Sequence, residues 1–515
     1  MTDNYQNTKR ITQNAFYLYI RMFVVMIIGL YTSRVILNAL GVEDYGINNV
    51  VGGIIVILSF ITSSFSQAIV RFFTFEVGKK NAKELNKLFS ISLIIFVFLS
   101  ILLILLAETI GLWFLKNKLV IAPERQNAAF WLFQFSLFTL VVNIINIPFN
   151  ALIISHERMN IFAYFSIVEV ILKLAVALLT KESSHDKLIS FGLLIFLSNL
   201  ITVGLYIGYS KRVFKNIYFR FVKDKKLFKD IISFTSWSLY GTSSVVIRGE
   251  GTNILINIFS GVAVNAARGI SFQVNSSITK FQSSFMNAIN PQIIKSYAQK
   301  NYDYLFNLIY KGAKFSFFLL FFLSLPILFN TNIILVTWLK LVPEHTINFI
   351  RLILVFSLIE SLSSSLITAQ LATGRIRNYQ LIIGTIQMLN LPVSYVFLKN
   401  GFQPEITIII FIFFSICSFI ARLIFLKRLV NLSIKQFLKN VVFKVFLVLI
   451  ISIPLPLISY LYLQNETTNF FVTSSISAVI TLYSIYTFGC TPSEHLYIKE
   501  KSIKIFKKII FHEKN

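Results

Sequence analysis

Residues 88–111 read LFSISLIIFVFLSILLILLAETIG, with one acidic side chain, Glu108, and no Lys or Arg. The hydrocarbon core of a bilayer is about 30 Å thick, and a helix of about 20 mainly apolar residues crosses it. This run therefore predicts a transmembrane helix, and the runs around it predict how often the chain crosses.

Apolar runs of similar length follow one another along almost the whole chain. We expect 14 spans, at 11–37, 45–70, 88–111, 128–154, 161–180, 188–209, 231–258, 262–290, 312–338, 346–372, 379–398, 403–425, 437–462 and 468–489. With 56% hydrophobic and 14% charged residues, the composition excludes a soluble domain of this length. The sequence thus predicts an all-α polytopic membrane protein with about 14 transmembrane helices.

The distribution of Lys and Arg predicts the orientation. Loops expected outside carry seven of the 48, namely Lys116, Lys118, Arg125, Lys181, Lys187, Lys340 and Lys399. The other loops, with both termini and the adjoining span ends, carry 33. Basic loops are cytoplasmic, so we expect both termini in the cytoplasm. The formal charge of +26 then lies at membrane edges beside anionic lipid, and we expect no nucleic-acid binding.

The chain resembles itself across its basic stretch. The matches, at an offset of about 219 residues, are Asn38–Val42 with Asn257–Val262, and Ala151, Ser155 and Asn160 with Ala369, Thr373 and Asn378. Six spans per repeat give parallel repeats, as in alternating-access transporters. We expect a six-helix lobe at 1–210, a basic cytoplasmic linker at 211–230, a second six-helix lobe at 231–425, two additional transmembrane helices at 426–490 and a basic cytoplasmic tail at 491–515.

Two spans carry more polar side chains than a lipid-facing helix tolerates. Span 262–290 holds Asn265, Arg268, Gln273, Asn275, Ser276, Ser277, Thr279, Lys280, Gln282, Ser283, Ser284, Asn287 and Asn290, and span 45–70 holds Asn48, Asn49, Ser59, Thr62, Ser63, Ser64, Ser66 and Gln67. We expect the first to line a cavity. For the second, cavity lining and helix packing by small residues both stay open.

The segment Arg248-Gly249-Glu250-Gly251 lies near the middle of span 231–258. Two glycines weaken a helix, and helices that break at mid-membrane often mark binding sites. We expect a binding site here. The alternative is a local Arg248–Glu250 pair that holds the bundle together.

Cations outnumber acids inside the spans. The cations are Arg21, Arg34, Lys173, Arg248, Arg268, Lys280, Arg351 and Arg422, and the acids are Glu108, Glu169, Glu250 and Glu360. Guanidinium groups match phosphate oxygens, so the interior suits an anionic substrate. The expected substrate-binding residues are Arg21, Arg34, Arg248, Arg268, Gln273 and Lys280.

Energy for transport must come from a gradient, because the chain has no nucleotide-binding P-loop. Glu360 lies among serines with no cation nearby in sequence, and we expect it to bind a coupling ion. Glu250 is the competing candidate, and Arg422, near a span end, is expected only to reach the headgroups. The dispersed histidines show neither catalytic nor metal-ligand spacing, so we expect no enzyme, metal or cofactor.

Three motifs resemble a known family. They are Thr32-Ser33-Arg34 through Leu40-Gly41-Val42-Glu43-Asp44-Tyr45-Gly46, Pro148-Phe149-Asn150-Ala151 leading to His156-Glu157-Arg158, and Ala288-Ile289-Asn290-Pro291-Gln292. With the layout of six, six and two spans, the chain resembles the polysaccharide flippases of the multidrug/oligosaccharidyl-lipid/polysaccharide exporter superfamily, closest to Wzx-type O-antigen flippases and capsule exporters.

The resemblance implies an inner-membrane flippase for an oligosaccharide linked to undecaprenyl pyrophosphate, with other polysaccharide assembly proteins as possible partners. An ion-coupled multidrug antiporter of the same superfamily is the nearest alternative, although a cationic interior repels cationic drugs. A membrane-embedded oligosaccharide polymerase or ligase is the alternative from another class. Its catalytic groups are expected on a large outer loop, and the longest here, 112–127, is short.

Overall fold

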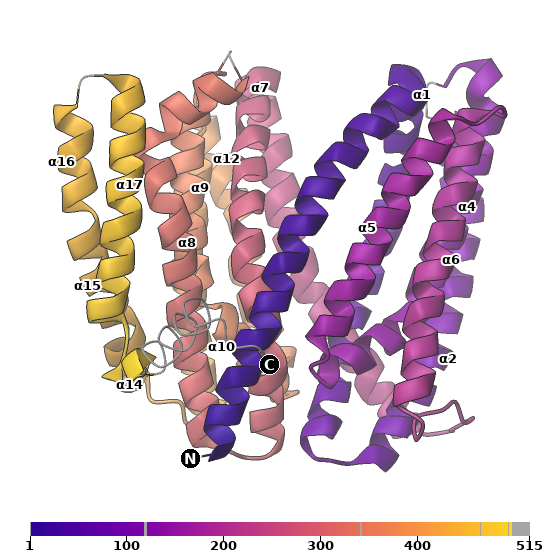
Figure 1. Cartoon of the computed structure of the whole chain (residues 1–515), viewed down its shortest axis with the longest axis horizontal. Helices are drawn as coiled ribbons and strands as arrows, with labels where there is room; N and C mark the ends of the chain where they lie inside the picture. The colour runs from indigo at the N-terminus through magenta and orange to yellow at the C-terminus, as the bar shows by residue number, and fades with distance from the viewer. Residues whose placement is uncertain (1, 118–120, 340–341, 464, 493, 497–515) are drawn as a thin grey trace, which may run out of the picture. The chain divides into compact units, whose positions relative to one another are not determined.

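The computed structural model describes the chain except for residues 1, 118–120, 340–341, 464, 493 and 497–515. All regular elements of the described residues are helices (Figure 1). They are α1 (Thr2–Gly78), α2 (Ala82–Leu106), η1 (Ala107–Gly111), α3 (Leu112–Asn117), η2 (Pro123–Arg125), α4 (Gln126–Ser155), α5 (Met159–Lys181), α6 (Lys187–Val213), α7 (Lys225–Ala298), α8 (Tyr302–Leu339), α9 (Thr346–Ser361), α10 (Ser364–Ala372), α11 (Arg377–Met388), α12 (Asn390–Lys399), α13 (Ile406–Val430), α14 (Ile434–Phe437), η3 (Leu438–Val442), α15 (Phe443–Ser452), α16 (Pro454–Tyr462), α17 (Glu466–Ser484) and η4 (Ile485–Gly489). The all-α prediction is confirmed; most of the predicted tail 491–515 lies outside the described residues.

Eleven helical segments of the described chain are long and apolar enough to cross a membrane. Three further long helical segments are not among these eleven: 42–78, 225–260 and 262–298. These are the second part of α1 and the two parts of α7, which correspond to the expected spans 45–70, 231–258 and 262–290. Together they make the 14 long helices that the sequence predicts.

Single glycines separate the two parts of α1 and of α7. Gly41 has φ 77° and ψ 174°, and Gly261 has φ 82° and ψ 178°. This backbone conformation is open almost only to glycine. Between the expected spans 11–37 and 45–70, only Gly41 is therefore non-helical. The break at the corresponding Gly261 supports the predicted repeat.

The chain forms two compact units. Unit 1 comprises Met1–Ser243, Asn287–Leu305 and Thr368–Leu381, and unit 2 comprises Ser244–Met286, Phe306–Ile367 and Ile382–Asn515. The units interleave in sequence. The last part of α7, the start of α8 and the α10–α11 turn belong to unit 1, although unit 2 surrounds them in the chain. The predicted lobes divided at 211–230 remain a prediction.

In unit 1, aromatic residues fill the core between α1, α2 and α4. Phe73, Phe96 and Phe133 are fully buried. Arg125 ties three helix starts together, because it pairs with Asp44 in α1 and with Asp186, the residue that caps α6 (both 2.6 Å). A carboxylate at a helix N-terminus accepts otherwise unpaired amide hydrogens, which explains why α6 starts there.

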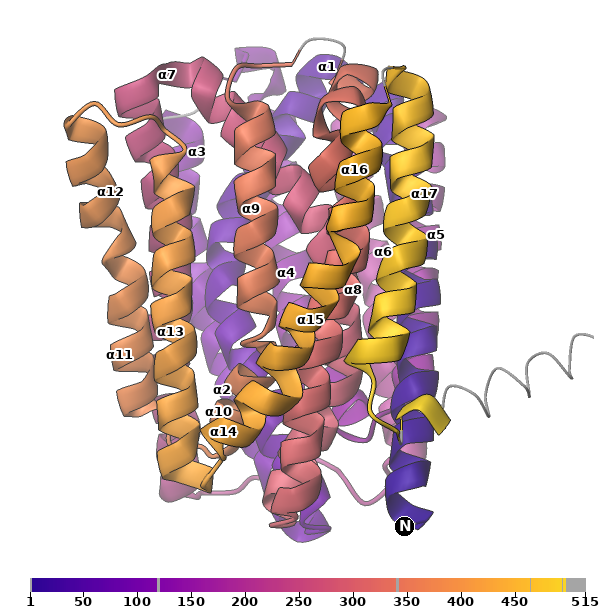
Figure 2. The same cartoon turned by 90° about the vertical axis from the view of Figure 1, so that its left-hand side faces the viewer.

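In unit 2, α8 supplies the aromatic core. Phe318 and Phe321 pack with Leu354 of α9 and Val448 of α15. A Cβ at Gly489 would lie 2.7 Å from the Phe318 ring, so the glycine lets the chain pack directly against this ring. Figure 2 shows α15, α16 and α17 beside α8, so the two additional membrane helices belong to the core of unit 2.

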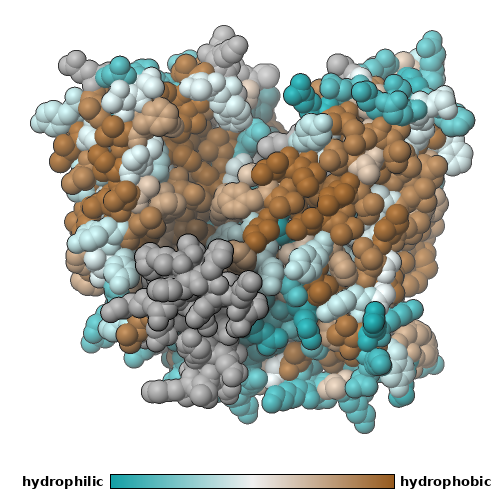
Figure 3. All heavy atoms as spheres, in the orientation of Figure 1, coloured by the Kyte–Doolittle hydropathy of each residue, from teal (hydrophilic) through white to brown (hydrophobic). Residues whose placement is uncertain are grey.

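Large apolar side chains remain exposed along the middle of the helices, for example Phe98, Leu105, Phe413 and Phe446. Figure 3 shows these hydrophobic bands in brown, with hydrophilic residues gathered at the helix ends. Such bands match the hydrocarbon of a bilayer, as expected for a multi-pass membrane protein.

Candidate functional site

The second part of α7 carries an exposed polar face. Gln273, Ser276, Ser277, Lys280 and Ser283 are exposed, and their spacing of three and four residues places them along one side of the helix. Polar groups on that side are costly against lipid, so this face suits a water-filled cavity. Two expected site residues, Gln273 and Lys280, lie on it.

Arg268 lies on the buried side of α7. Its guanidinium donates to Asn253 Oδ1 (3.1 Å) and to the Gly249 carbonyl (2.9 Å), and its Cζ lies 4.2 Å from the centre of the Phe272 ring. These bonds connect the two parts of α7 on either side of Gly261. Arg268 is therefore partly structural, although its buried Nε has no hydrogen-bond partner.

The expected break at Gly249 and Gly251 is wrong, because α7 is helical there and departs from helical geometry only at Gly261. A Cβ at Gly251 would lie 2.2 Å from Leu391 Cδ1. Close packing therefore explains this glycine. Glu250 is exposed, and no ion pair joins it to Arg248 among the described residues, so the local pair is also wrong.

Arg248 instead extends to α11 and into an aromatic environment. It donates to Gln387 Oε1, and its Cζ lies 4.9 Å from the Phe411 ring centre and 5.1 Å from that of Phe356. Gln387 in turn donates to Ser418 Oγ on α13 (3.0 Å). Cation–π contacts of this kind stabilise a desolvated guanidinium.

Glu360 has the cationic partner that the sequence did not reveal. Arg422 Nη1 donates to its Oε1 (3.0 Å), and Ser415 Oγ donates to its Oε2 (2.5 Å). Arg248 also interacts electrostatically with both Glu360 and Arg422. The cation that Glu360 lacks nearby in sequence is thus supplied by α13. The assignment of Arg422 to the headgroups is wrong, since its side chain is only 6% exposed.

In unit 1 the two expected substrate-binding cations, Arg21 and Arg34, differ in burial. Arg21 is partly buried with its Cζ 4.6 Å from the Phe162 ring centre, whereas Arg34 is exposed. Glu169 and Lys173 pair at 2.6 Å on α5, as their spacing predicts. Arg248, Arg268 and Lys280 thus all lie on α7, whereas Arg21 and Arg34 lie on α1 in unit 1.

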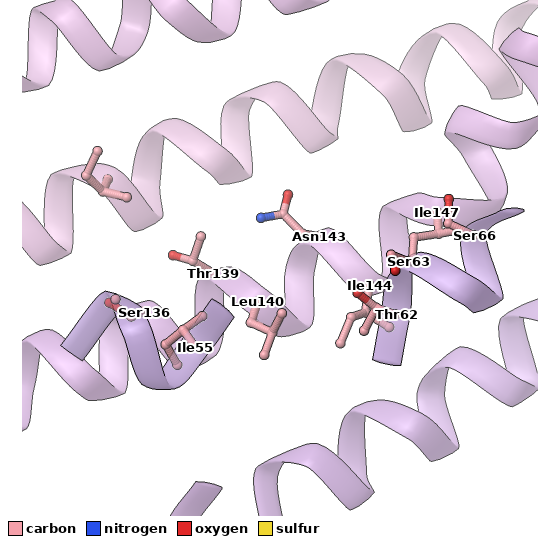
Figure 4. A pocket seen from close by; sticks show the side chains of 12 residues that line it. Ile55, Thr62, Ser63, Ser66, Ser136, Thr139, Leu140, Asn143, Ile144 and Ile147 are labelled. Atoms are coloured by element: carbon pink, nitrogen blue, oxygen red, sulfur yellow. The ribbon is translucent and has the colours of Figure 1, made fainter. Parts of the chain in front are cut away.

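Unit 1 also contains a cavity of about 470 Å³. Its lining comprises Gly52, Ile55, Thr62, Ser63 and Ser66 of α1, Ser136, Thr139, Leu140, Asn143, Ile144 and Ile147 of α4, and Ile195 of α6. Figure 4 shows the labelled side chains of α1 and α4 around it. The polar residues of span 45–70 therefore line a cavity, at least at 62, 63 and 66.

The contribution of α4 to this cavity escaped the sequence analysis. Ser136, Thr139, Asn143, Asn146 and Asn150 recur every three or four residues, which places them within an arc of about 80° at 100° per residue. Asn146 and Asn150 each hold a buried Oδ1 without a hydrogen-bond partner. The spacing alone predicts a polar face on this helix, although the rest of the span is apolar.

Comparisons with known proteins agree with this architecture. Residues 11–270 match the model of a family described as "Polysaccharide biosynthesis protein". No relative is found among curated proteins. Among the described residues, no group of His, Cys, Asp and Glu is suited to a metal ion.

Several solved transporter structures share the fold. The outward-facing conformation of a multidrug resistance MATE family transporter of the MOP superfamily has a TM-score of 0.72 at 14% identity, over 83% of this chain and 97% of that one. MATE in the bent conformation has a TM-score of 0.71 at 14% identity, over 82% and 96%. A MOP superfamily transporter from Pyrococcus furiosus, described as having a binding pocket of reverse polarity, has a TM-score of 0.67 at 14% identity, over 81% and 95%.

Proposed function

Because the chain belongs to the polysaccharide biosynthesis protein family, we propose that it is a flippase for lipid-linked oligosaccharides. Its substrate is an oligosaccharide on undecaprenyl pyrophosphate, moved from the cytoplasmic to the periplasmic leaflet of a bacterial inner membrane for O-antigen or capsule synthesis. The family match over residues 11–270 carries this proposal. The MATE-like fold supports membrane transport.

The exposed face of α7 is the proposed site for the pyrophosphate. Lys280 supplies a charged donor to phosphate oxygens, and Gln273 supplies an amide N–H on the same face. Arg248 and Arg268 are tied to Gln387, Asn253 and Gly249. These bonds hold both guanidinium groups within unit 2, so we assign the direct phosphate contacts to Lys280 and Gln273 instead.

The Glu360–Arg422 pair is the proposed coupling element. Because the Arg422 guanidinium pairs with the Glu360 carboxylate, a proton or sodium ion binds Glu360 only after it displaces that guanidinium. Such an exchange gives two alternative pairings, and alternating access of the two lobes needs a two-state element of that kind. Glu250, exposed on α7, is the competing coupling site.

An ion-coupled multidrug antiporter is the second candidate, because solved proteins of this fold are described as multidrug transporters. The excess of Arg and Lys over Glu within the spans favours an anionic substrate instead. A polymerase or ligase has less support, since the loop 112–127 is short.

The test of the proposed site compares two lysines of unit 2. Lys280→Ala removes the charged donor of the exposed α7 face, whereas Lys399→Ala removes an exposed lysine at the end of α12. Undecaprenyl pyrophosphate binding to the purified protein in nanodiscs should weaken about tenfold in the first variant, the loss typical of one hydrogen bond to a charged group. Equal binding by both variants would remove the support for this site.

A further inference from the structure

The cavity of unit 1 combines an uncharged polar lining with an apolar one. Of its lining side chains, the polar ones are hydroxyls and one amide: Thr62, Ser63, Ser66, Ser136, Thr139 and Asn143. The remainder are Ile and Leu side chains and Gly52. Its volume of about 470 Å³ lies within the range of small-ligand sites, roughly 300–1,000 Å³.

Several of these polar groups are available to a ligand. Among the described residues, no hydrogen bond involves Ser66, Ser136 or Asn143, and Asn143 is exposed into the cavity (Figure 4). Farther along the same face of α4, Asn146 and Asn150 each keep an unpartnered buried Oδ1. Asn146 and Asn150 lie outside the cavity lining, but Ser66, Ser136 and Asn143 belong to it. Polar groups without partners are costly in apolar surroundings, so a ligand that offers both donors and acceptors to these three side chains would bind favourably.

The chemistry of the lining selects among ligand classes. The lining residues that the structure describes include neither a cation for phosphate nor an acid for a cationic drug. A hydrocarbon chain would leave Ser66, Ser136 and Asn143 without hydrogen-bond partners. A sugar matches both halves of the lining, since its hydroxyls donate and accept while its C–H faces pack on Ile and Leu side chains.

We propose that the cavity between α1, α4 and α6 of unit 1 is a subsite for the neutral glycan of the substrate, with Asn143 and Thr139 as its principal hydrogen-bonding residues. This inference rests on the proposed function, because it assumes a substrate that carries an oligosaccharide. It assigns the sugar to unit 1, separately from the pyrophosphate on α7.

The test uses substitutions that keep shape and remove polarity. Asn143→Leu and Thr139→Val remove the amide and one hydroxyl. The matched control is Thr109→Val, because Thr109 Oγ1 donates to the carbonyl four residues earlier (2.7 Å), just as Thr139 Oγ1 does (2.8 Å), but lies outside the cavity. Melting temperatures of the full-length proteins in nanodiscs establish that each variant is folded.

Three probes separate the glycan from the lipid. They are undecaprenyl-pyrophosphate oligosaccharide extracted from the native host, undecaprenyl pyrophosphate alone, and the oligosaccharide released by mild acid. Asn143→Leu should weaken binding of the first and third probes about tenfold and Thr139→Val severalfold, with the second unchanged within twofold and Thr109→Val like wild type. A loss shared equally with undecaprenyl pyrophosphate, or no loss in either cavity variant, overturns the subsite.

The outcome for the subsite is distinct from that for the proposed function. If the released oligosaccharide binds wild type and Asn143→Leu weakens it, the subsite stands even when no lipid-linked substrate is flipped. If wild type flips the lipid-linked oligosaccharide but binds it no better than undecaprenyl pyrophosphate, the function stands and the subsite is wrong. If wild type binds no released oligosaccharide at millimolar concentration, the subsite is wrong as well.

Discussion

Arg422 of α13 donates a hydrogen bond of 3.0 Å to the carboxylate of Glu360 on α9, 62 residues earlier in the chain. The arginine side chain is 6% exposed and that of the glutamate 29% exposed. Removing one partner of a buried ion pair leaves an uncompensated charge. If the pair takes part in transport, Arg422 therefore needs another negative partner whenever Glu360 binds the coupling ion.

Glu360→Gln is therefore expected to abolish the response of flipping to an imposed pH or sodium gradient while substrate binding survives. The measurement is flipping in proteoliposomes with and without each gradient. Glu169→Gln is the control, because Glu169 pairs with Lys173 in a half-exposed position on α5. A gradient response in Glu360→Gln equal to that of wild type contradicts the coupling role, as does a wild type that ignores both gradients.

Glu157 connects distant segments of unit 1. Its carboxylate accepts from Gln292 Nε2 (2.5 Å) and from Lys295 Nζ, and Arg10 Nε lies 3.4 Å away, although Glu157 itself is 1% exposed. Glu157→Gln is expected to destabilise the protein by about 3–5 kcal/mol, because Lys295 loses its buried counter-charge.

Thermal unfolding in detergent measures this difference. Glu84→Gln is the comparison, since the Glu84–Lys87 pair is about one third exposed at each end and exposed pairs contribute about 1 kcal/mol or less. Similar melting temperatures for the two variants would show that Glu157 does not hold the ends of α1 and α7 to the α4–α5 turn.

Asp186 gives unit 1 a pH-dependent stability. Burial alone raises the pKa of its carboxyl, but hydrogen bonds from Arg125 and from the amides of Ile189 and Leu188 outweigh burial and hold the pKa below its ordinary value. A group with a lowered folded-state pKa contributes stability above its unfolded pKa, about 3.9 for Asp, and loses it as the pH falls through the folded value.

Arg125→Gln is therefore expected to lower stability by about 1 kcal/mol at pH 7, and the deficit should shrink as the pH falls below about 4. Melting temperatures of wild type and variant across pH 3 to 8 test this expectation. A deficit that is constant over that range, or that grows in acid, contradicts the proposed role of the Asp186 pair.

The distribution of basic residues predicts which ends of the helices are cytoplasmic. In a variant without Cys417 and Cys490, cysteines placed at Glu182 and Asn465 should react with an impermeant thiol reagent added to intact cells. A cysteine at Lys223 should stay unlabelled until the cells are opened. All three positions are exposed, so labelling reports the side of the membrane. Labelling of position 223 in intact cells would show that the orientation is the opposite of the predicted one.

Local sequence patterns predicted the features that depend on local physics. Apolar runs predicted the helices, and the resemblance of Asn38–Val42 to Asn257–Val262 predicted two corresponding regions, each of which contains a non-helical glycine, Gly41 or Gly261. The polar face of α7 was equally readable, since polar side chains at helical spacing in a membrane span demand a polar environment.

Pairings between helices were not predictable in the same way. Glu360 and Arg422 are 62 residues apart, and Glu157 and Gln292 are 135 apart, so no spacing rule joins them. Gly251 was misread because a glycine that permits close packing against Leu391 looks the same in sequence as one that breaks a helix. The role of a glycine depends on its neighbours in the fold.

The most direct test of the account is translocation by the purified protein. Proteoliposomes are loaded with a fluorescent undecaprenyl-pyrophosphate oligosaccharide, and an impermeant reagent that quenches only the outer leaflet reports its crossing. We expect the protein to speed this crossing over protein-free vesicles and Lys280→Ala to slow it, whereas Lys399→Ala does not. Crossing no faster than in protein-free vesicles, with and without pH and sodium gradients, would contradict the proposal that the protein is a lipid-linked oligosaccharide flippase.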